Sequence, residues 1–449
     1  MTAPTKTDSG WDFSLIDPIT TSFVEAMENR SIVMNFATPP QWLFKTPKGP
    51  VVTPEDPNVR FLDYEQGTEL RDPSMRELVS YYTSLYSYYC KGGFTDETGT
   101  FRKGYHFKFD WFEIFNEADF EYAMSMEQYT ERYDAIVTAL QKLFPEAKFV
   151  GLGLGGHNDF SRYVYFLHAG NHNPPSVPVD GFSFHFYALT DASMTTYEKA
   201  ALSVFTQTDT FLQEVDQILL IKKEYRHEAQ IFINEIGCGH YPEPAFGWAK
   251  YWTLCSSMYA YLYSELAKKG VEVVGQSQMI GFVNGTNAEW PSTSMMDWRD
   301  GQPNARYWML KMLIDRFGSA PTMKSVINTS LVSTSDSKAE SDDVYAQGFI
   351  VNGHAGNPSA AQTVLLVHKG ASTTSAIDVS LDVFSGRKCS TSASGAPRMC
   401  FVDASTAPHA YSCSDVVGGV VTMRPGMVAV VDCIVEAGHD RLRLTPRVS

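Results

Sequence analysis

DWFEIFNE, at residues Asp110 to Glu117, is the most informative stretch of this sequence. It begins as an aromatic, apolar run of the kind that forms a buried strand, and it ends in an amide and a carboxylate, Asn116 and Glu117. A second run of the same kind, QIFINEIG at residues 230–237, carries Glu235 near its end. In a barrel of parallel strands, the C-terminal strand ends open onto the substrate-binding face. The two runs therefore predict two carboxylates on that face.

Helices and strands are expected to alternate from residue 13 to residue 317. The expected helices are residues 13–30, 73–91, 126–145, 161–169, 196–225, 245–269 and 305–317. The expected strands are residues 31–36, 110–117, 148–154, 181–187, 230–236 and 278–284. Strands that alternate with helices predict a parallel sheet, here a (β/α)8 barrel of the TIM type.

The number of expected strands falls short of eight. If residues 110–117 form the fourth barrel strand, residues 31–36 form the third, and only residues 1–30 precede it. Two further βα units need at least about 50 residues. We therefore expect the barrel to be N-terminally incomplete in this chain, without its first two strands, and to expose two parallel strand edges.

The sequence pattern changes beyond residue 320. Short β-rich runs punctuated by Ser, Thr and Gly replace the helical spacing, at residues 325–333, 344–351, 363–368, 377–384, 419–423 and 427–434. This pattern is typical of an antiparallel β-sandwich. We expect a barrel domain over residues 1–320, a β-sandwich over residues 321–437, and a disordered tail over residues 438–449.

Charge and cysteine content narrow the possible partners and compartment. The formal net charge is -15 and the pI about 5.2, which argues against nucleic acid or an anionic membrane as partner, because both require clustered Lys and Arg.

Residues 1–10 carry no apolar segment typical of a secretory signal. Four of the 7 cysteines, Cys389, Cys400, Cys413 and Cys433, predict two disulfides and an oxidising compartment. The full-length protein is therefore expected to be secreted or extracellular, and to be a monomer.

The motifs resemble one large clan of enzymes. The pair Asn116–Glu117 after an aromatic strand, the tripeptide 185–187 (HFY) and Glu235 in INEIG are similar to the retaining glycoside hydrolases built on a (β/α)8 barrel. The motif WFEIFNE at residues 111–117, together with PPQW at residues 39–42, is most similar to the motifs of family 39, the β-xylosidase and α-L-iduronidase group. Families 30, 79 and 5 share the core motifs. The resemblance covers roughly residues 13–435.

The resemblance implies a retaining O-glycoside hydrolase that cleaves β-linked glycosides or polysaccharides with two Glu side chains. Glycoside cleavage needs an acid for the leaving oxygen and, for retention, a carboxylate nucleophile. We assign Glu117 as acid/base and Glu235 as nucleophile. Asn116 is expected to hydrogen-bond the sugar 2-hydroxyl. The alternative for each side chain is a structural role at a strand end, and the alternative for the whole chain is a catalytically inactive carbohydrate-binding relative.

Five further residues are candidates for substrate binding. Tyr187 and His185 lie one pleat apart and so share a strand face. By resemblance, Tyr187 orients the nucleophile and His185 lines the site. Trp290 and Trp42 are candidate platforms for the sugar ring, and His157 is a weaker candidate. Core or domain packing is the alternative for each of them.

The run GLGLGG at residues 151–156 matches GxGxxG formally. A dinucleotide site requires such a run to open a helix in the first βα unit of a nucleotide-binding fold. Here the tripeptide 157–159 intervenes and the run lies in the middle of the barrel. We therefore favour glycines that serve a strand turn, and we expect no cofactor and no metal. Cys238, three residues after Glu235, is interpreted as a packed thiol and not as a nucleophile.

Overall fold

The structure is a computed structural model. It describes residues 5–7, 10–36, 39–45, 68–241, 243–279, 294–297, 301–318, 324–331, 342–351, 361–372, 375–383, 387–388, 397–406, 410–434 and 441–448. Within these ranges, no helix combines the length and the apolar character needed to span a membrane. The chain divides into two compact units. The first comprises residues 1–186, 214–236 and 271–275, and the second comprises residues 187–213, 237–270 and 276–449.

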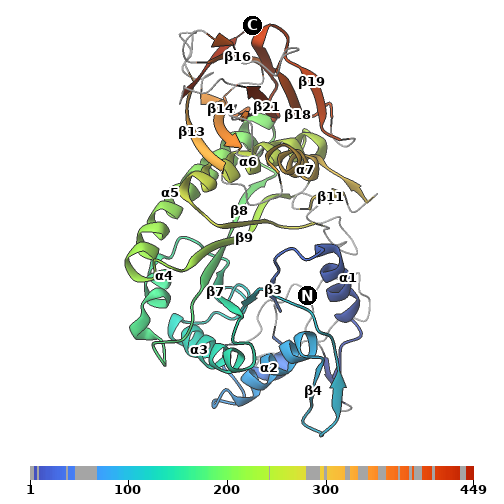
Figure 1. Cartoon of the computed structure of the whole chain (residues 1–449), viewed down its shortest axis with the longest axis vertical. Coiled ribbons are helices and arrows are strands. Elements are labelled where there is room, and N and C mark those ends of the chain that lie inside the picture. Colours follow the sequence, from blue (N-terminus) through green and yellow to red (C-terminus); the bar gives the residue numbers. More distant parts are fainter. Residues whose placement is uncertain are drawn as a thin grey trace. The chain divides into compact units, whose positions relative to one another are not determined.

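A six-stranded parallel sheet organises the first unit (Figure 1). Its strands follow one another in space in the same order as in the sequence: β3 (Val33–Asn35), β6 (Trp111–Glu113), β7 (Lys148–Leu154), β8 (Gly181–Asp191), β9 (Gln230–Tyr241) and β10 (Val273–Gln276). The pairs β3–β6, β6–β7 and β7–β8 are parallel. Sequential parallel strands joined by helices form the curled sheet of an α/β barrel. The predicted α/β barrel architecture is confirmed at this level.

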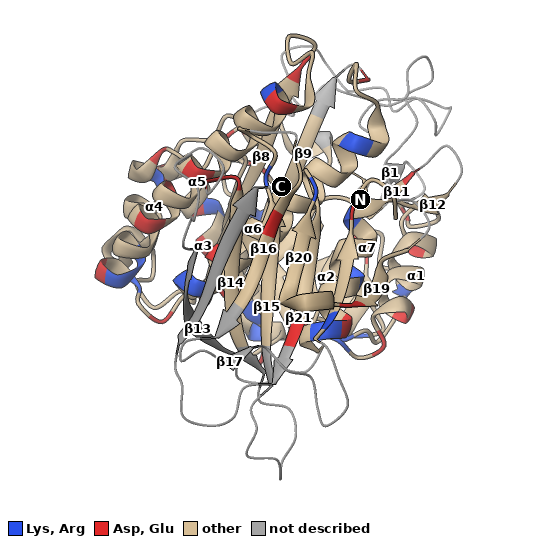
Figure 2. Cartoon of the chain, turned by 90° about the horizontal axis from the view of Figure 1, so that it is seen from above, with Lys and Arg blue, Asp and Glu red and all other residues tan. Residues whose placement is uncertain are grey.

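The helices are α1 (Asp17–Met27), α2 (Arg76–Cys90), α3 (Met126–Leu143), α4 (Phe160–Leu167), α5 (Tyr197–Tyr225), α6 (Trp248–Lys269) and α7 (Ala305–Phe317). Along the chain, one helix follows each of the strands β3, β6, β7, β8 and β9 and precedes the next strand of the sheet, whereas α1 comes before β3 and α7 after β10 (Figure 1). Helix α3 begins at a capping box, in which Ser125 and Gln128 satisfy each other's backbone amides. Helix α6 ends at Gly270, whose φ of 79° suits glycine. Acidic and basic residues lie interspersed along α3 and α5 (Figure 2).

Several short elements accompany the main sheet. The N-terminal strands β1 (Thr5–Thr7) and β2 (Gly10–Asp12) form an antiparallel hairpin of their own. Two further small hairpins pair β4 (Gly93–Thr95) with β5 (Phe101–Lys103) and β11 (Met296–Asp297) with β12 (Gln302–Pro303). The sixth parallel strand among the described residues is β10, which ends at Gln276, so residues 278–279 of the expected strand at residues 278–284 lie just beyond it. Residues 280–284 of that expectation lie outside the described residues.

The C-terminal strands form a second, mostly antiparallel sheet within the second unit. In spatial order they are β17 (Arg387–Lys388), β16 (Ile377–Val383), β22 (Arg441–Val448), β13 (Lys324–Leu331), β14 (Val344–Val351), β15 (Ala361–His368), β21 (Val428–Ile434), β18 (Arg398–Val402) and β19 (Ser412–Asp415), with β20 (Val420–Met423) beside β16. Apolar residues of β14, β15, β16, β20 and β21 share one buried cluster. The predicted antiparallel β-region is confirmed, and its division into a sandwich, like the boundary at residue 320, stays a prediction.

The prediction of a disordered tail is wrong for residues 441–448. These residues form β22, which pairs in parallel with β13 and antiparallel with β16. The physical reason is visible in the sequence RLRLTPRV, because polar or charged residues alternate with apolar ones at the period of a strand.

Within the described part of the chain, disulfides join two pairs of cysteines. One links Cys400 to Cys413 across the antiparallel pair β18–β19. Cys389 and the side chain of Cys433 lie outside the described residues, so the second predicted disulfide stays a prediction. The other observed disulfide links Cys238 of β9 to Cys255 of α6. The interpretation of Cys238 as a packed thiol is therefore wrong, because the helix that follows β9 returns a second cysteine to the strand.

Candidate active site

The turn after β6 places Glu117. The strand itself is fully buried, but it ends at Glu113, four residues earlier than expected, and Phe115 and Glu117 beyond it both take positive φ, 65° and 41°. Positive φ is sterically costly for residues with a side chain and persists only where the surroundings enforce it. Here the Glu117 amide donates to the Gly153 carbonyl at 2.7 Å, and the Glu117 carbonyl accepts the amides of Phe120 and Glu121 at 2.8 and 2.7 Å. These bonds fix the backbone of Glu117.

The glycine run packs against this same turn. The amides of Gly155 and Gly156 donate to the carboxylate of Asp119 at 3.0 and 2.9 Å. A Cβ on Gly155 would clash with the ring of Phe120 in its present position, so glycine leaves room for this ring. The run therefore holds a side chain of its own chain, which supports the interpretation as a strand turn over a nucleotide-binding loop.

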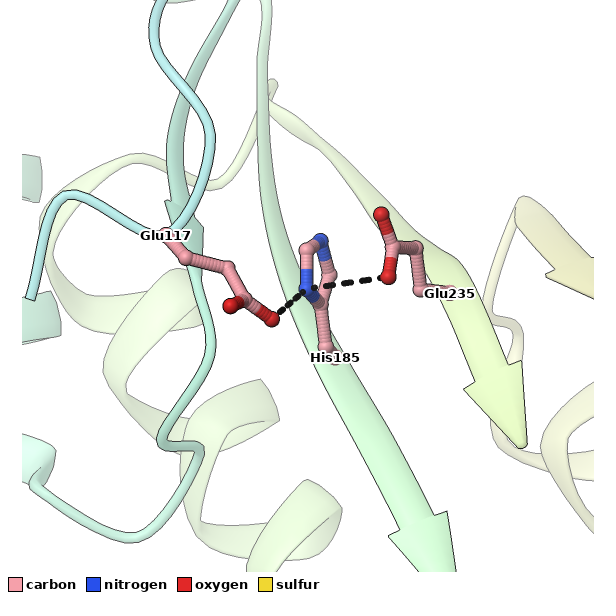
Figure 3. A group of neighbouring side chains, drawn as sticks. All are labelled: Glu117, His185 and Glu235. Atoms are coloured by element: carbon pink, nitrogen blue, oxygen red, sulfur yellow. Dashed lines mark hydrogen bonds and ion pairs between the residues drawn. The ribbon is translucent and has the colours of Figure 1, made fainter. Parts of the chain in front are cut away.

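Glu117, His185 and Glu235 converge at one point (Figure 3). His185 Nδ1 lies 2.9 Å from Glu117 Oε1 and 3.6 Å from Glu235 Oε2. One oxygen of each carboxylate and this nitrogen lie within 4.8 Å of one another. The His185 side chain is fully buried, whereas the two carboxylates remain 23% and 34% exposed. The imidazole thus lies between two carboxylates that solvent, or a ligand, can reach.

Opposing effects set the pKa of His185. Burial lowers it, but the hydrogen bond to Glu117 and the negative charges of Glu235, Glu117 and Glu113 outweigh burial, so that the pKa is raised above 6.5. Because Nδ1 faces a carboxylate oxygen, it carries a proton in both charge states of the ring. Nε2 is buried and has no hydrogen-bond partner among the described residues.

A buried carboxylate, Glu113, lies in the same strand segment as the site. It is only 1% exposed and accepts hydrogen bonds from three other strands. The donors are Asn35 Nδ2 of β3 at 2.9 Å, Ser183 Oγ of β8 at 2.5 Å, and Asn234 Nδ2 of β9 at 2.8 and 2.9 Å. Burial raises the pKa of Glu113, and these donors oppose the rise. Asn234 precedes Glu235, and Ser183 lies one pleat before His185, so this carboxylate connects the strands that carry the site.

Sequence reasoning missed Glu113 and its three partners. The available signal was a single carboxylate within the apolar run WFEIF, since a charge in a buried strand must find donors. The identity of those donors could not be read from the sequence, because they come from three separate strands.

The structure places the other predicted residues in different surroundings. Asn116 Nδ2 donates to Glu121 Oε1 at 3.0 Å. In the second unit, the Tyr187 hydroxyl donates to Ser277 Oγ at 2.8 Å. The role of Tyr187 in orienting the nucleophile Glu235 stays a prediction. Trp42 lies in a 3-10 turn (Gln41–Leu43) with its ring 6.0 Å from that of Tyr81 in an edge contact.

The last two candidates are His157 and Trp290, and no described contact links either of them to the cluster of Glu117, His185 and Glu235. His157 Nε2 lies 3.5 Å from Glu214 Oε2, and its ring stacks on that of Phe186. Burial lowers the pKa of His157 to about 4, so the ring is neutral at pH 7. Trp290 lies outside the described residues. A substrate-binding role for either residue stays a prediction.

The cluster of Glu117, His185 and Glu235 also has the composition of a metal site, within the part of the chain that the structure describes. Two carboxylates and one imidazole could serve as ligands of a divalent ion such as zinc. A catalytic zinc site uses three protein ligands and an open position. Paired carboxylates without a metal are equally the machinery of glycoside hydrolysis.

Solved structures with similar folds include glycoside hydrolases. A family 51 arabinofuranosidase from Xanthomonas axonopodis pv. citri has a TM-score of 0.54 and 12% identity, over 79% of this chain and 73% of its own. A glucosidase from Croceicoccus marinus has a TM-score of 0.55 and 12% identity, over 96% and 83%. A family 51 α-L-arabinofuranosidase from Bifidobacterium longum has a TM-score of 0.52 and 12% identity, over 79% and 73%. Neither a family model nor a curated protein matches the chain.

These similarities concern the fold. The chain has the α/β barrel architecture of glycoside hydrolases, but at 12% identity the substrate of a neighbour does not carry over. Membership of family 39 within the clan stays a prediction.

Proposed function

We propose that this chain is a retaining O-glycoside hydrolase that cleaves β-linked glycosides or polysaccharides. The observation that carries the proposal is the short distance between Glu117 and Glu235. One carboxylate oxygen of Glu117 lies within 4.8 Å of one carboxylate oxygen of Glu235. Retaining enzymes hold their two carboxyl groups about 5 to 5.5 Å apart, whereas inverting enzymes leave about 6.5 to 9.5 Å for a water molecule. The spacing therefore favours retention. The barrel fold that the chain shares with glycoside hydrolases supports the same class of reaction.

The reaction would proceed through two displacements. In the first, a Glu235 oxygen attacks the anomeric carbon, the glycosidic bond breaks, and Glu117 gives its proton to the leaving oxygen. The product of this step is an ester between the sugar and Glu235. In the second, Glu117 takes a proton from a water molecule, which attacks the same carbon and releases Glu235 as a carboxylate. Glu117 ends protonated, ready for the next cycle.

His185 would act on both carboxylates without touching the reacting carbon. Its Nδ1–H donates to Glu117 at 2.9 Å and lies 3.6 Å from Glu235. A cation between two carboxylates offsets their mutual repulsion. This arrangement supports the close approach of the two carboxylates. Asn116 is proposed to bind the sugar 2-hydroxyl.

A substrate panel with matched variants tests the proposal. The panel consists of aryl β-xyloside, β-glucoside, β-uronide and α-L-arabinofuranoside, the last because two similar folds belong to arabinofuranosidases. We expect turnover of at least one, and a loss of about 10³-fold or more in Glu235→Gln, since an amide does not form the ester. Glu228→Gln, at an exposed position, is the control and should match the wild type.

Two further measurements identify the roles of the Glu117 and Glu235 carboxylates. A fluorosugar probe should label Glu235 in the intact chain, and a label on another residue would refute its assignment. Glu117→Ala should lose about 10²- to 10⁴-fold on substrates with poor leaving groups and far less on dinitrophenyl glycosides, which need little protonation. Equal losses on both would exclude Glu117 as the acid.

The alternative is a catalytically inactive carbohydrate-binding relative. It would bind oligosaccharides, as measured by calorimetry, while hydrolysing no member of the panel and taking no label from the fluorosugar.

We also propose that the full-length protein functions outside the cell. The disulfides Cys238–Cys255 and Cys400–Cys413 support this location, because disulfides persist in oxidising compartments. Alkylation of protein from its native source without reduction should leave these four cysteines unmodified. Quantitative alkylation of all four would contradict the proposal.

A further inference from the structure

A third carboxyl group, Glu121, lies beside the two proposed catalytic ones. Its amide donates to the carbonyl of Glu117 at 2.7 Å, so the backbone of the turn holds the two residues together. The Glu121 side chain is only 4% exposed. The two-carboxylate mechanism assigns this group no role, although burying a carboxyl group is costly unless it forms hydrogen bonds.

The contact of Glu121 is with Asn116. Asn116 Nδ2 donates to Glu121 Oε1 at 3.0 Å. An Asn amide has donors on one side and an acceptor on the other. A carboxyl oxygen that accepts from Nδ2 therefore selects one of the two flipped orientations of the amide, and leaves Oδ1 and the second N–H of Asn116 facing elsewhere.

Oε1 remains an acceptor for Asn116 whether or not the carboxyl group is ionised. Burial and the charges of Glu117 and Glu235 raise the pKa of Glu121 to about 7, and the bond from Asn116 opposes the rise. A proton would therefore reside on Oε2, which has no hydrogen-bond partner among the described residues. The orientation of Asn116 is thus insensitive to this titration.

We propose that Glu121 is a positioning residue for glycoside cleavage, which holds the amide of Asn116 in the orientation that binds the sugar hydroxyl next to the reacting carbon. The proposal rests on the proposed function and adds a residue to it. Binding to that hydroxyl strengthens in the transition state, so a misoriented amide lowers the rate of the chemical step more than substrate binding.

The test compares one substrate that has the 2-hydroxyl with its 2-deoxy analogue. Glu121→Met keeps an unbranched buried side chain but removes the acceptor. We expect kcat/KM on the parent substrate to fall about 10- to 100-fold, mostly in kcat, the loss that corresponds to one buried hydrogen bond. The 2-deoxy analogue should lose far less. The ratio of the two values is independent of the fraction of folded enzyme, so it remains informative if the variant is less stable.

Three controls sharpen the result. Glu121→Gln retains an acceptor oxygen and should keep the wild-type ratio, whereas Glu131→Met, at an exposed position of α3, should not change it. In an Asn116→Ala background, Glu121→Met should cause no further loss on the parent substrate, because the two changes remove the same interaction.

The outcomes separate this inference from the proposed function. The positioning role is refuted if Glu121→Met lowers kcat/KM equally on the parent substrate and on the 2-deoxy analogue. It is also refuted if Glu121→Met adds its full loss to that of Asn116→Ala. In either case the proposed glycosidase activity is unaffected. If the wild-type chain cleaves no glycoside at all, the proposed function fails, and the role of Glu121 falls with it.

Discussion

Replacing Glu113 with leucine should destabilise the barrel unit strongly. The carboxylate is 1% exposed and accepts hydrogen bonds from Asn35, Ser183 and Asn234. Leucine offers no acceptor, so the donors would stay buried without their partner. A buried donor left unsatisfied costs about 1–3 kcal/mol.

The cost differs among the three donors. Asn234 Nδ2 donates only to this carboxylate among the described residues. Asn35 Nδ2 keeps its second bond, to the Phe115 carbonyl at 3.0 Å, and Ser183 Oγ can turn to the Gly151 carbonyl at 3.1 Å. The loss therefore falls on Asn234 and on one N–H of Asn35, which predicts about 2–6 kcal/mol in the free energy of unfolding.

Thermal melting measures this loss. For a unit of about 200 residues, each kcal/mol lowers the midpoint by about 2–4 °C, so Glu113→Leu should melt several degrees below the wild type. Glu113→Gln should lose less, because the Oδ1 atoms of Asn35 and Asn234 have no partner among the described residues and a flipped amide could accept from the glutamine. Glu131→Leu, on an exposed face of α3, is the control. A Glu113→Leu midpoint equal to that of Glu113→Gln would refute the reasoning.

Three further outcomes are expected. The pKa of Glu121 rises from 4.5 to about 7 on folding, so its contribution to stability is present at low pH and lost as the pH rises through 7; urea titrations of Glu121→Gln should lack this loss. The pKa of His185 is raised above 6.5, so the stability lost in His185→Ala should be largest below pH 6.5 and shrink as the pH rises, and a constant difference would contradict the ion pair. Replacing Cys400 and Cys413 with serine opens a link between residues 13 apart and should cost about 2–4 kcal/mol in calorimetry; an unchanged transition would exclude a stabilising role.

The sequence by itself determined the order of the elements and the two carboxylates of the proposed site. Apolar runs of strand length that alternate with helices of period 3.6 specify a parallel sheet, because such strands are buried on both faces. The strand from residue 148 to 154 and the helix from residue 305 to 317 were predicted with the boundaries that the structure shows. Glu117 and Glu235 were predictable because each follows an apolar run, where a polar residue is out of place unless it meets a ligand.

The tertiary structure alone decided which side chains meet. The donors to Glu113 come from three strands far apart in the sequence, and no local pattern records that they converge. The same holds for the bridge of His185 between Glu117 and Glu235 and for the disulfide between Cys238 and Cys255. Hydrophobic periodicity reports which face of an element is buried, because burial is an average property of that face. A hydrogen bond or a disulfide depends on the position of two particular atoms, and the packing of strands and helices sets that position.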